Sequence, residues 1–158
     1  MNELDALFAG EAECALYRWL SPVAPQELAH EVLARGWRFF YLDGRQARDK
    51  RDFLKAAAAA MHFPAYFGHN WDAFEECITD LAPAPGYVLL YDHVWWLACE
   101  QPASWQVARS ILEMACAQWA SQGTPFLVLL RHTRGCSGVT PLLRAPRPHQ
   151  LTLGAGLR

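Results

Sequence analysis

Residues 64–81 read PAYFGHNWDAFEECITDL and combine a helix-start signal with a clear apolar stripe. Asn70 or Asp72 can cap a helix that begins near Trp71, because both side chains accept hydrogen bonds from the first free backbone N–H groups. The i, i+3, i+4, i+7 spacing of a buried helical face is met by Phe74, Cys77, Ile78 and Leu81. We therefore predict an amphipathic helix over residues 71–81, preceded by a glycine-bearing loop around Gly68.

Upstream of this stretch the sequence predicts strand, helix, strand and helix. Residues 50–62 follow a possible N-cap at Asp49, contain five consecutive alanines and stop before Pro64, which predicts a helix. The aromatic run at residues 37–42 ends at an Asp-Gly turn and predicts a strand. Residues 25–36 open with proline and close with glycine, as helices do, and residues 15–20 alternate like a short strand.

Downstream, two continuous apolar runs at residues 86–91 and 125–130 have the length and composition of strands buried on both faces. A long helix is expected between them, from Ser104 to about Gln122. The alternation predicts one α/β domain with a mostly parallel sheet: three core strands, the first of the two runs central, plus an extra N-terminal strand. Residues 151–153 suggest a last edge strand, and the pattern leaves open whether Trp95, Trp96 and Trp105 are core or surface residues.

Composition excludes several classes of protein. The chain has 158 residues, 53% of them hydrophobic, and a formal net charge of −2, which is typical of one globular domain and not of a disordered tether. No stretch approaches the roughly 18 consecutive apolar residues that span a bilayer, and the acidic start is unlike a secretory leader, so we expect a cytoplasmic protein. Five widely spaced cysteines suggest reduced, mostly buried thiols, and the scattered histidines suggest no metal site and no cofactor.

Charge is segregated along the chain. No lysine or arginine occurs between Lys55 and Arg109, a window that contains six acidic residues, whereas no acidic residue follows Met114. A patch of one sign attracts partners of the opposite sign, so the acidic window argues against nucleic-acid binding there. The simpler alternative is that these acids only solvate exposed helix faces.

The acidic window and the predicted helix coincide in residues 64–81. Tyr66 and Trp71 are rigid aromatic side chains of the kind enriched in protein interfaces. The same stretch carries a carboxylate array with no cation nearby in the sequence, formed by Asp72, Glu75, Glu76 and Asp80. Such an array resembles nucleic-acid phosphates in charge and could fill a cationic site through arginine–carboxylate pairs. Alternatively, the two aromatic residues only pack the loop onto the core.

Enzyme signatures are missing from the sequence. There is no GxGxxG, P-loop, GxSxG or HExxH motif. His69 with Cys77 could form a base and thiol nucleophile, but Cys77 lies on the apolar stripe without a local cation to lower its pKa. Asp72 and Glu76 could act as an acid–base pair in a cleft, although two acids at i,i+4 repel each other unless solvated or met by a cationic partner. We therefore predict that the chain is not an enzyme.

The PxYFGxNWDA core, with an alanine-rich helix before it and an amphipathic helix after it, resembles the barstar family of intracellular inhibitors of barnase-type ribonucleases. The order of the surrounding elements is also similar to that family from Trp37 to Arg131. The resemblance implies a barstar-like α/β layer over residues 37–131, with residues 1–36 as a strand–helix extension packed on it. Residues 132–158, rich in glycine, proline and arginine, form a tail outside the resemblance.

The resemblance also implies a function. Tyr66, Gly68, Asn70 and Asp72 match the family's inhibitory loop and helix start, and Glu76 stands where the family has its central aspartate. With Trp71, Glu75 and Asp80, these residues would bind a barnase-type or diverged basic ribonuclease toxin, as the immunity protein of a toxin–antitoxin pair. Glu75, Trp71, Leu81 and Gln118 depart from the family pattern. The alternative is a regulatory or interaction domain on the same scaffold, with nucleic-acid contact through the arginine-rich tail.

Overall fold

The computed structural model describes residues 5, 8, 16–64 and 67–134. Four strands form one sheet in the order β1-β4-β3-β2, and every pairing in the described part of the chain is parallel. The strands are β1 (Leu16–Arg18), β2 (Arg38–Asp43), β3 (Tyr87–Asp92) and β4 (Phe126–Leu130). The predicted α/β architecture with a parallel sheet and a central β3 is confirmed.

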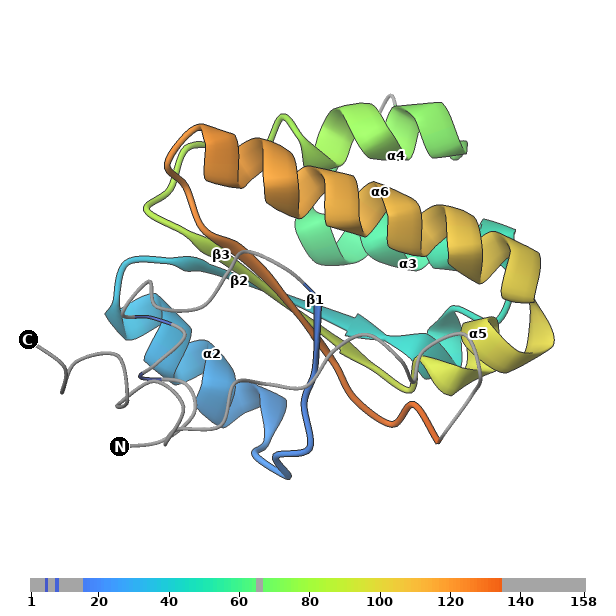
Figure 1. Cartoon of the computed structure of the whole chain (residues 1–158), viewed down its shortest axis with the longest axis horizontal. Coiled ribbons are helices and arrows are strands. Elements are labelled where there is room, and N and C mark those ends of the chain that lie inside the picture. Colours follow the sequence, from blue (N-terminus) through green and yellow to red (C-terminus); the bar gives the residue numbers. More distant parts are fainter. Residues whose placement is uncertain (1–4, 6–7, 9–15, 65–66, 135–158) are drawn as a thin grey trace, which may run out of the picture.

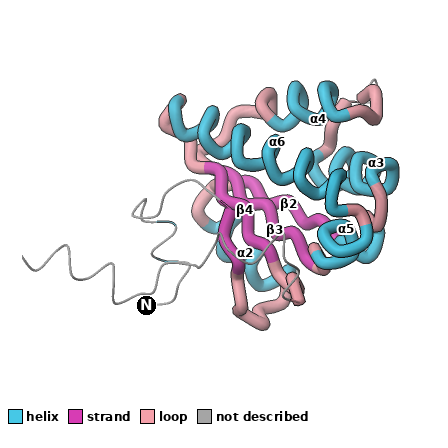
Figure 2. Tube along the Cα trace, turned by 45° about the vertical axis from the view of Figure 1, so that its right-hand side comes forward, coloured by secondary structure: helices cyan, strands magenta, loops and turns pink. Residues whose placement is uncertain are grey.

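Helices cover both faces of the sheet (Figures 1 and 2). One face carries α2 (Pro25–Ala34). The other carries α3 (Lys50–Met61), α4 (Trp71–Ile78) and α6 (Pro102–Ser121), with α5 (Trp95–Glu100) and the short 3₁₀ turn η1 (Gly44–Gln46) at one end. Because α4 packs chiefly on α3 and α6, it is the outermost helix of its layer.

The apolar runs of β3 and β4 are explained by two hydrophobic cores, one on each face. Val88 and Leu90 pack toward α2, where Leu28 and Val32 are fully buried. Leu89 and Tyr91 belong to the larger core beneath α3, α4 and α6. Successive residues of a strand point to opposite faces, so a strand covered on both sides must be apolar at every position.

Several helix boundaries differ from the sequence expectations. Helix α4, expected over residues 71–81, ends at Ile78, because Thr79 is its C-cap. Helix α3 ends at Met61 because His62 adopts a left-handed backbone (φ 56°), two residues before the proline that we expected to end it. Helix α6 begins at Pro102 instead of Ser104, and the short α5 before it was not predicted. Trp105 is fully buried, whereas Trp95 and Trp96 are half-buried. The strand expected at residues 151–153 lies outside the described residues.

The expectation of reduced cysteines is wrong at Cys99. Cys99 is disulfide-bonded, whereas Cys77 and Cys116 are free thiols; Cys14 and Cys136 lie outside the described residues. Spacing along a chain does not reveal which cysteines meet in space, so this bond could not be expected from the cysteine pattern. Within the described ranges, no group of histidine, cysteine and acidic residues is placed to hold a metal ion, and no helix is long and apolar enough to cross a membrane.

Candidate functional site

The loop that leads into α4 is anchored by a buried aromatic ring. Phe67 is buried, with its ring centroid 5.3 Å from that of Phe63 and 4.9 Å from that of His69. The backbone then turns sharply at His69, which has a left-handed φ of 50°, a conformation that non-glycine residues adopt only in tight local structures. The anchored ring and the turn together fix where α4 begins.

Asn70 caps α4 and also holds the loop in place. Its Oδ1 accepts a hydrogen bond from the Ala73 backbone N–H at 2.8 Å, and its Nδ2 donates to the Gly68 carbonyl at 3.3 Å. A Cβ at Gly68 would lie 3.0 Å from that Nδ2, so a larger residue would press on the cap. Of the two caps that the sequence allowed, the structure selects Asn70, and Asp72 lies in the first turn of the helix.

Helix α4 buries one face and exposes the other. Phe74 and Ile78 are fully buried, and the Trp119 indole N–H of α6 donates to the Ile78 carbonyl at 2.9 Å. The opposite surface is what we call the acidic face, and its four exposed members are Asp72, Glu75, Glu76 and Asp80. Burial of the apolar stripe therefore orients all four carboxylates toward solvent.

No side chain in the described part of the chain neutralises the acidic face. None of its four carboxylates forms an ion pair or accepts a side-chain hydrogen bond from the described residues. The fold does bring Arg38 close: with Glu76 and Asp80 it lines a surface hollow of about 230 Å³. Sequence reasoning expected no nearby cation and missed this one, because Arg38 lies at the start of β2, far away along the chain.

Three of the four carboxylates lie at or just beyond the C-terminal end of α4, where negative charge is unfavourable. A helix C-terminus carries a partial negative charge, so acids there are destabilising, whereas acids in the first turn are favourable. Asp72 lies in the first turn of α4, but Glu75 and Glu76 lie in its last turn, and Asp80 follows the C-cap Thr79. The arrangement is electrostatically unfavourable for the isolated protein and would be relieved by a cationic partner.

Trp71 is one of the two aromatic residues of the predicted interface, and it is partly packed on the core. Trp71 is half-buried, with its ring centroid 5.8 Å from that of Phe53 and 6.2 Å from that of Phe74, and with Lys50 Nζ 5.8 Å from its centroid. It therefore packs on the core and also offers an edge to solvent beside the acidic face. Tyr66 lies outside the described residues.

This outer-helix site lies within a segment that matches a known family. The model of the family described as Barstar (barnase inhibitor) matches residues 37–131, the same residues over which the sequence resemblance runs. The chain belongs to the barstar family. The match covers β2 to β4 and contains the whole acidic face, while β1 and α2 precede it. A comparison with curated proteins found no match.

The structure does not place Cys77 and His69, the possible thiol nucleophile and its base, in a reactive arrangement. Cys77 is half-buried, and burial, followed by the charges of Glu76 and Asp80, raises the pKa of its thiol. A nucleophilic cysteine needs the opposite environment. The hollow that Cys77 lines contains His62, whereas the His69 ring packs against Phe67. The environment of Cys77 therefore disfavours the thiolate.

One acid of the sequence window has a structural role. Asp92 is buried at the end of β3 and forms a two-pronged ion pair with Arg131, at 2.6 Å to Nε and 2.8 Å to Nη2. Tyr41 donates a further hydrogen bond to Asp92 at 3.0 Å. Neither partner lies near the other in the sequence; the parallel pairing of β3 with β4 brings them together. Asp92 is therefore not available to bind a partner protein.

Proposed function

We propose that this protein is an immunity-type inhibitor that blocks the active site of a barnase-type, or diverged, basic ribonuclease. The inhibitory surface is formed by the loop and the acidic face of α4: Tyr66, Gly68, Asn70, Trp71, Asp72, Glu75, Glu76 and Asp80. The protein itself is not catalytic and needs no cofactor. Membership of a family described as barnase inhibitors supports this proposal.

The observation that carries the proposal is the unneutralised charge at the end of α4. Exposed carboxylates that repel each other and oppose the helix dipole lower the stability of the free protein. A ribonuclease site that binds RNA phosphates presents arginine, lysine or histidine, and these groups would pair with the carboxylates. Charge complementarity would also accelerate the encounter of the two proteins.

Glu76 is the central residue of the proposed contact. It lies between Asp72 and Asp80 on the exposed side of α4 and borders the hollow next to Arg38. Its side chain is one methylene longer than the aspartate usual in the family. The Glu76 carboxylate would therefore contact the partner's cation farther from the helix axis. This difference favours a target whose basic site is deeper than, or shaped differently from, that of barnase.

We expect such a protein to act in the cytoplasm of a cell that produces the ribonuclease, as the antitoxin of a toxin–antitoxin pair. Premature RNA cleavage inside that cell would be prevented by a tight complex formed before secretion. The regulatory alternative, in which the scaffold no longer inhibits a ribonuclease, predicts no dependence of RNA cleavage on this protein at any ratio.

The test is a titration of a purified barnase-type ribonuclease with the full chain, using a fluorogenic RNA substrate. The Glu76→Gln variant should inhibit at least about thirtyfold more weakly, because breaking a hydrogen-bonded interfacial charge pair costs roughly 2 kcal/mol or more. The matched control is Glu113→Gln on α6, since Glu113 is also exposed but pairs with Arg109 at 3.0 Å. Equal inhibition by all three proteins would place the contact elsewhere, and no inhibition by a folded protein would favour a diverged target or the regulatory alternative.

A further inference from the structure

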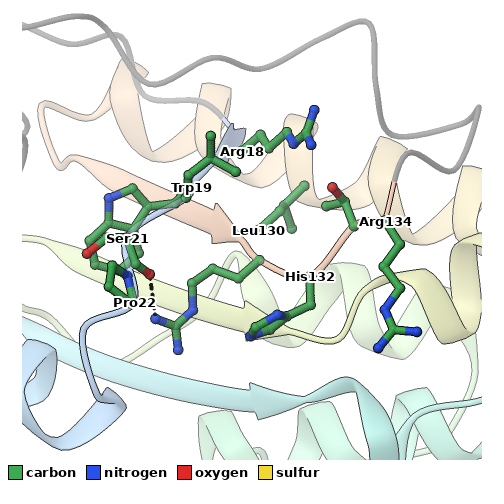
Figure 3. A pocket seen from close by; sticks show the side chains of 10 residues that line it. Arg18, Trp19, Ser21, Pro22, Leu130, His132 and Arg134 are labelled. Atoms are coloured by element: carbon green, nitrogen blue, oxygen red, sulfur yellow. Dashed lines mark hydrogen bonds between the residues drawn. The ribbon is translucent and has the colours of Figure 1, made fainter.

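A second charged site lies at the carboxyl edge of the sheet, away from α4. A cavity of about 420 Å³ is bounded by the last residues of β1 and β4 and by the residues that follow them (Figure 3). Its lining contains three arginines and one histidine but no acidic residue: Arg18, Arg131, His132 and Arg134. In open parallel sheets, ligands bind outside the carboxyl ends of strands. The position and the charge of this cavity both suit an anion.

One of the three arginines is fully engaged in the fold. Arg131 forms the ion pair with Asp92, and its Nη1 donates to the carbonyls of Ser21 and Val23 at 3.0 and 2.6 Å. It thereby holds the segment after β1 against β4 and builds the wall of the cavity. The cations that remain for a ligand are therefore Arg18 and Arg134.

Neither of these two arginines is paired with a carboxylate of the described residues. Arg18 is half-buried. Its Nε atom is buried and has no hydrogen-bond partner among the described residues. Arg134 is exposed, and its guanidinium lies 4.8 Å from the centroid of the Trp95 ring. A buried donor without an acceptor is costly, and a bound anion would satisfy it.

Arg134 connects the cavity to a layered arrangement of flat groups, which we call the cation–aromatic stack: Arg134, Trp95, Trp96 and Arg48. The two indoles are stacked with centroids 4.0 Å apart and planes at 29°, and the Arg48 guanidinium lies 3.8 Å from the Trp96 centroid. Arg48 is exposed and also has no carboxylate partner in the described part of the chain. Trp95 and Trp96 are half-buried, so part of this stack faces solvent.

Stacking on an indole orients each arginine and leaves its N–H donors free to bind a ligand. The N–H groups of a guanidinium lie in its plane, so a guanidinium that rests on an indole still offers its donors at the edge, in the geometry that a phosphate accepts. Arg45 provides the contrast nearby, because its guanidinium already binds both carboxylate oxygens of Asp43 at 2.9 to 3.2 Å. The carboxyl edge thus carries two exposed arginines that rest on aromatic rings, Arg48 and Arg134, and the half-buried Arg18, none of them paired with a carboxylate of the described residues.

We propose that the cavity and the cation–aromatic stack form a binding site for single-stranded nucleic acid. Phosphates pair with Arg18, Arg48 and Arg134, and bases stack on the outward guanidinium planes of Arg48 and Arg134, because the indole faces are covered within the stack. Cations combined with flat stacking groups are what proteins use to bind single strands without reading their sequence. The proposal does not depend on ribonuclease inhibition, because none of these residues belongs to the acidic face.

The test is a fluorescence-anisotropy titration of labelled oligouridylate and oligothymidylate, each of about ten nucleotides, with the full chain at several salt concentrations. The Arg48→Ala/Arg134→Ala double variant should bind roughly tenfold more weakly, and its log–log salt slope should be shallower by about 1.4, since each phosphate contact on a single strand contributes about 0.7. Both residues are exposed, so the melting temperature should change little. Intrinsic tryptophan fluorescence should be quenched on binding to the unmodified protein.

The matched control is Arg35→Ala. Arg35 also rests on an aromatic ring, 4.0 Å from the Phe8 centroid, but it pairs with Asp5 and follows α2 at the opposite edge of the sheet. Its loss should leave affinity within about twofold. The proposal would be overturned by an equal loss in the Arg35 variant, by unchanged binding in the double variant, by no binding at low salt, or by equal affinity for a duplex of the same length.

Discussion

Replacing Glu76 with glutamine should stabilise the free protein. The residue lies in the last turn of α4, where a negative charge opposes the helix dipole by about 0.3–1 kcal/mol. It also repels Asp72, four residues before it on the same helix, by about 0.2–0.5 kcal/mol. Because the side chain is exposed and forms no ion pair with the described residues, the only attraction lost is the screened one to Arg38 across the surface hollow, and attraction between exposed charges contributes little. We expect a gain of about 1 kcal/mol in the free energy of unfolding, or about 2–4 °C in melting temperature for a chain of this size.

Urea unfolding followed by tryptophan fluorescence measures this gain. The midpoint should rise without a change in the slope of free energy against urea, and the gain should shrink at high salt because exposed charges are screened. Glu113→Gln should move the other way by a few tenths of a kcal/mol, since it breaks the Arg109 ion pair. A loss of more than about 0.5 kcal/mol on replacing Glu76 would mean that its carboxylate is paired within the fold, and the reasoning for the interface would fail.

Three further predictions concern the core and the thiol. Asp92→Asn should cost about 3 kcal/mol in urea unfolding, because its partner Arg131 is only 7% exposed and would keep an uncompensated charge; a cost below about 1 kcal/mol would contradict the role of this pair. Burial and Asp92 raise the pKa of Tyr41 to about 12, above its unfolded value near 10, so its stabilising contribution is complete below pH 10 and declines as the pH rises toward 12. The melting temperature of the Tyr41→Phe variant should fall less between these two pH values than that of the unmodified protein. An equal fall in both proteins would show that Tyr41 does not cause this pH dependence. Cys77, with its raised thiol pKa, should be alkylated more slowly near neutral pH than a free thiol standard, as peptide mass spectrometry can measure; faster labelling would revive the nucleophile hypothesis.

The elements of the fold could be predicted wherever a local pattern has a single physical explanation. The apolar runs of β3 and β4 required burial on both faces, and Asp49 and the five alanines required α3. The short α5 was missed because six residues are too few to establish a helical period, and its stacked tryptophans suit a surface as well as a core. The end of α3 was placed one residue late because the left-handed turn falls on His62, and no glycine, the usual residue of such a turn, marks the position.

The charges of the site could be predicted, but their neighbours could not. Exposure of Glu76 and Asp80 follows from the apolar stripe on the other side of α4, which the sequence contains. The approach of Arg38, the pairing of Asp92 with Arg131 and the disulfide at Cys99 all depend on which segments lie together in three dimensions. A single sequence gives no information about such contacts, because ion pairs and cysteine pairs form across any distance along the chain.

The two charged surfaces stay apart because the fold separates the segments that carry them. The acidic face lies on α4, the outermost helix of one layer, whereas Arg18 ends β1, and Arg48 and Arg134 follow β2 and β4 at the carboxyl edge of the sheet. A basic ribonuclease held on α4 would therefore leave the carboxyl edge open to a single strand. The two proposals together predict a ternary complex, in which labelled oligothymidylate bound to the Arg-rich edge keeps its affinity when the ribonuclease is added in equal amount. Competition between them would mean that the bound ribonuclease also covers the carboxyl edge, and the confinement of its contact to α4 would be wrong.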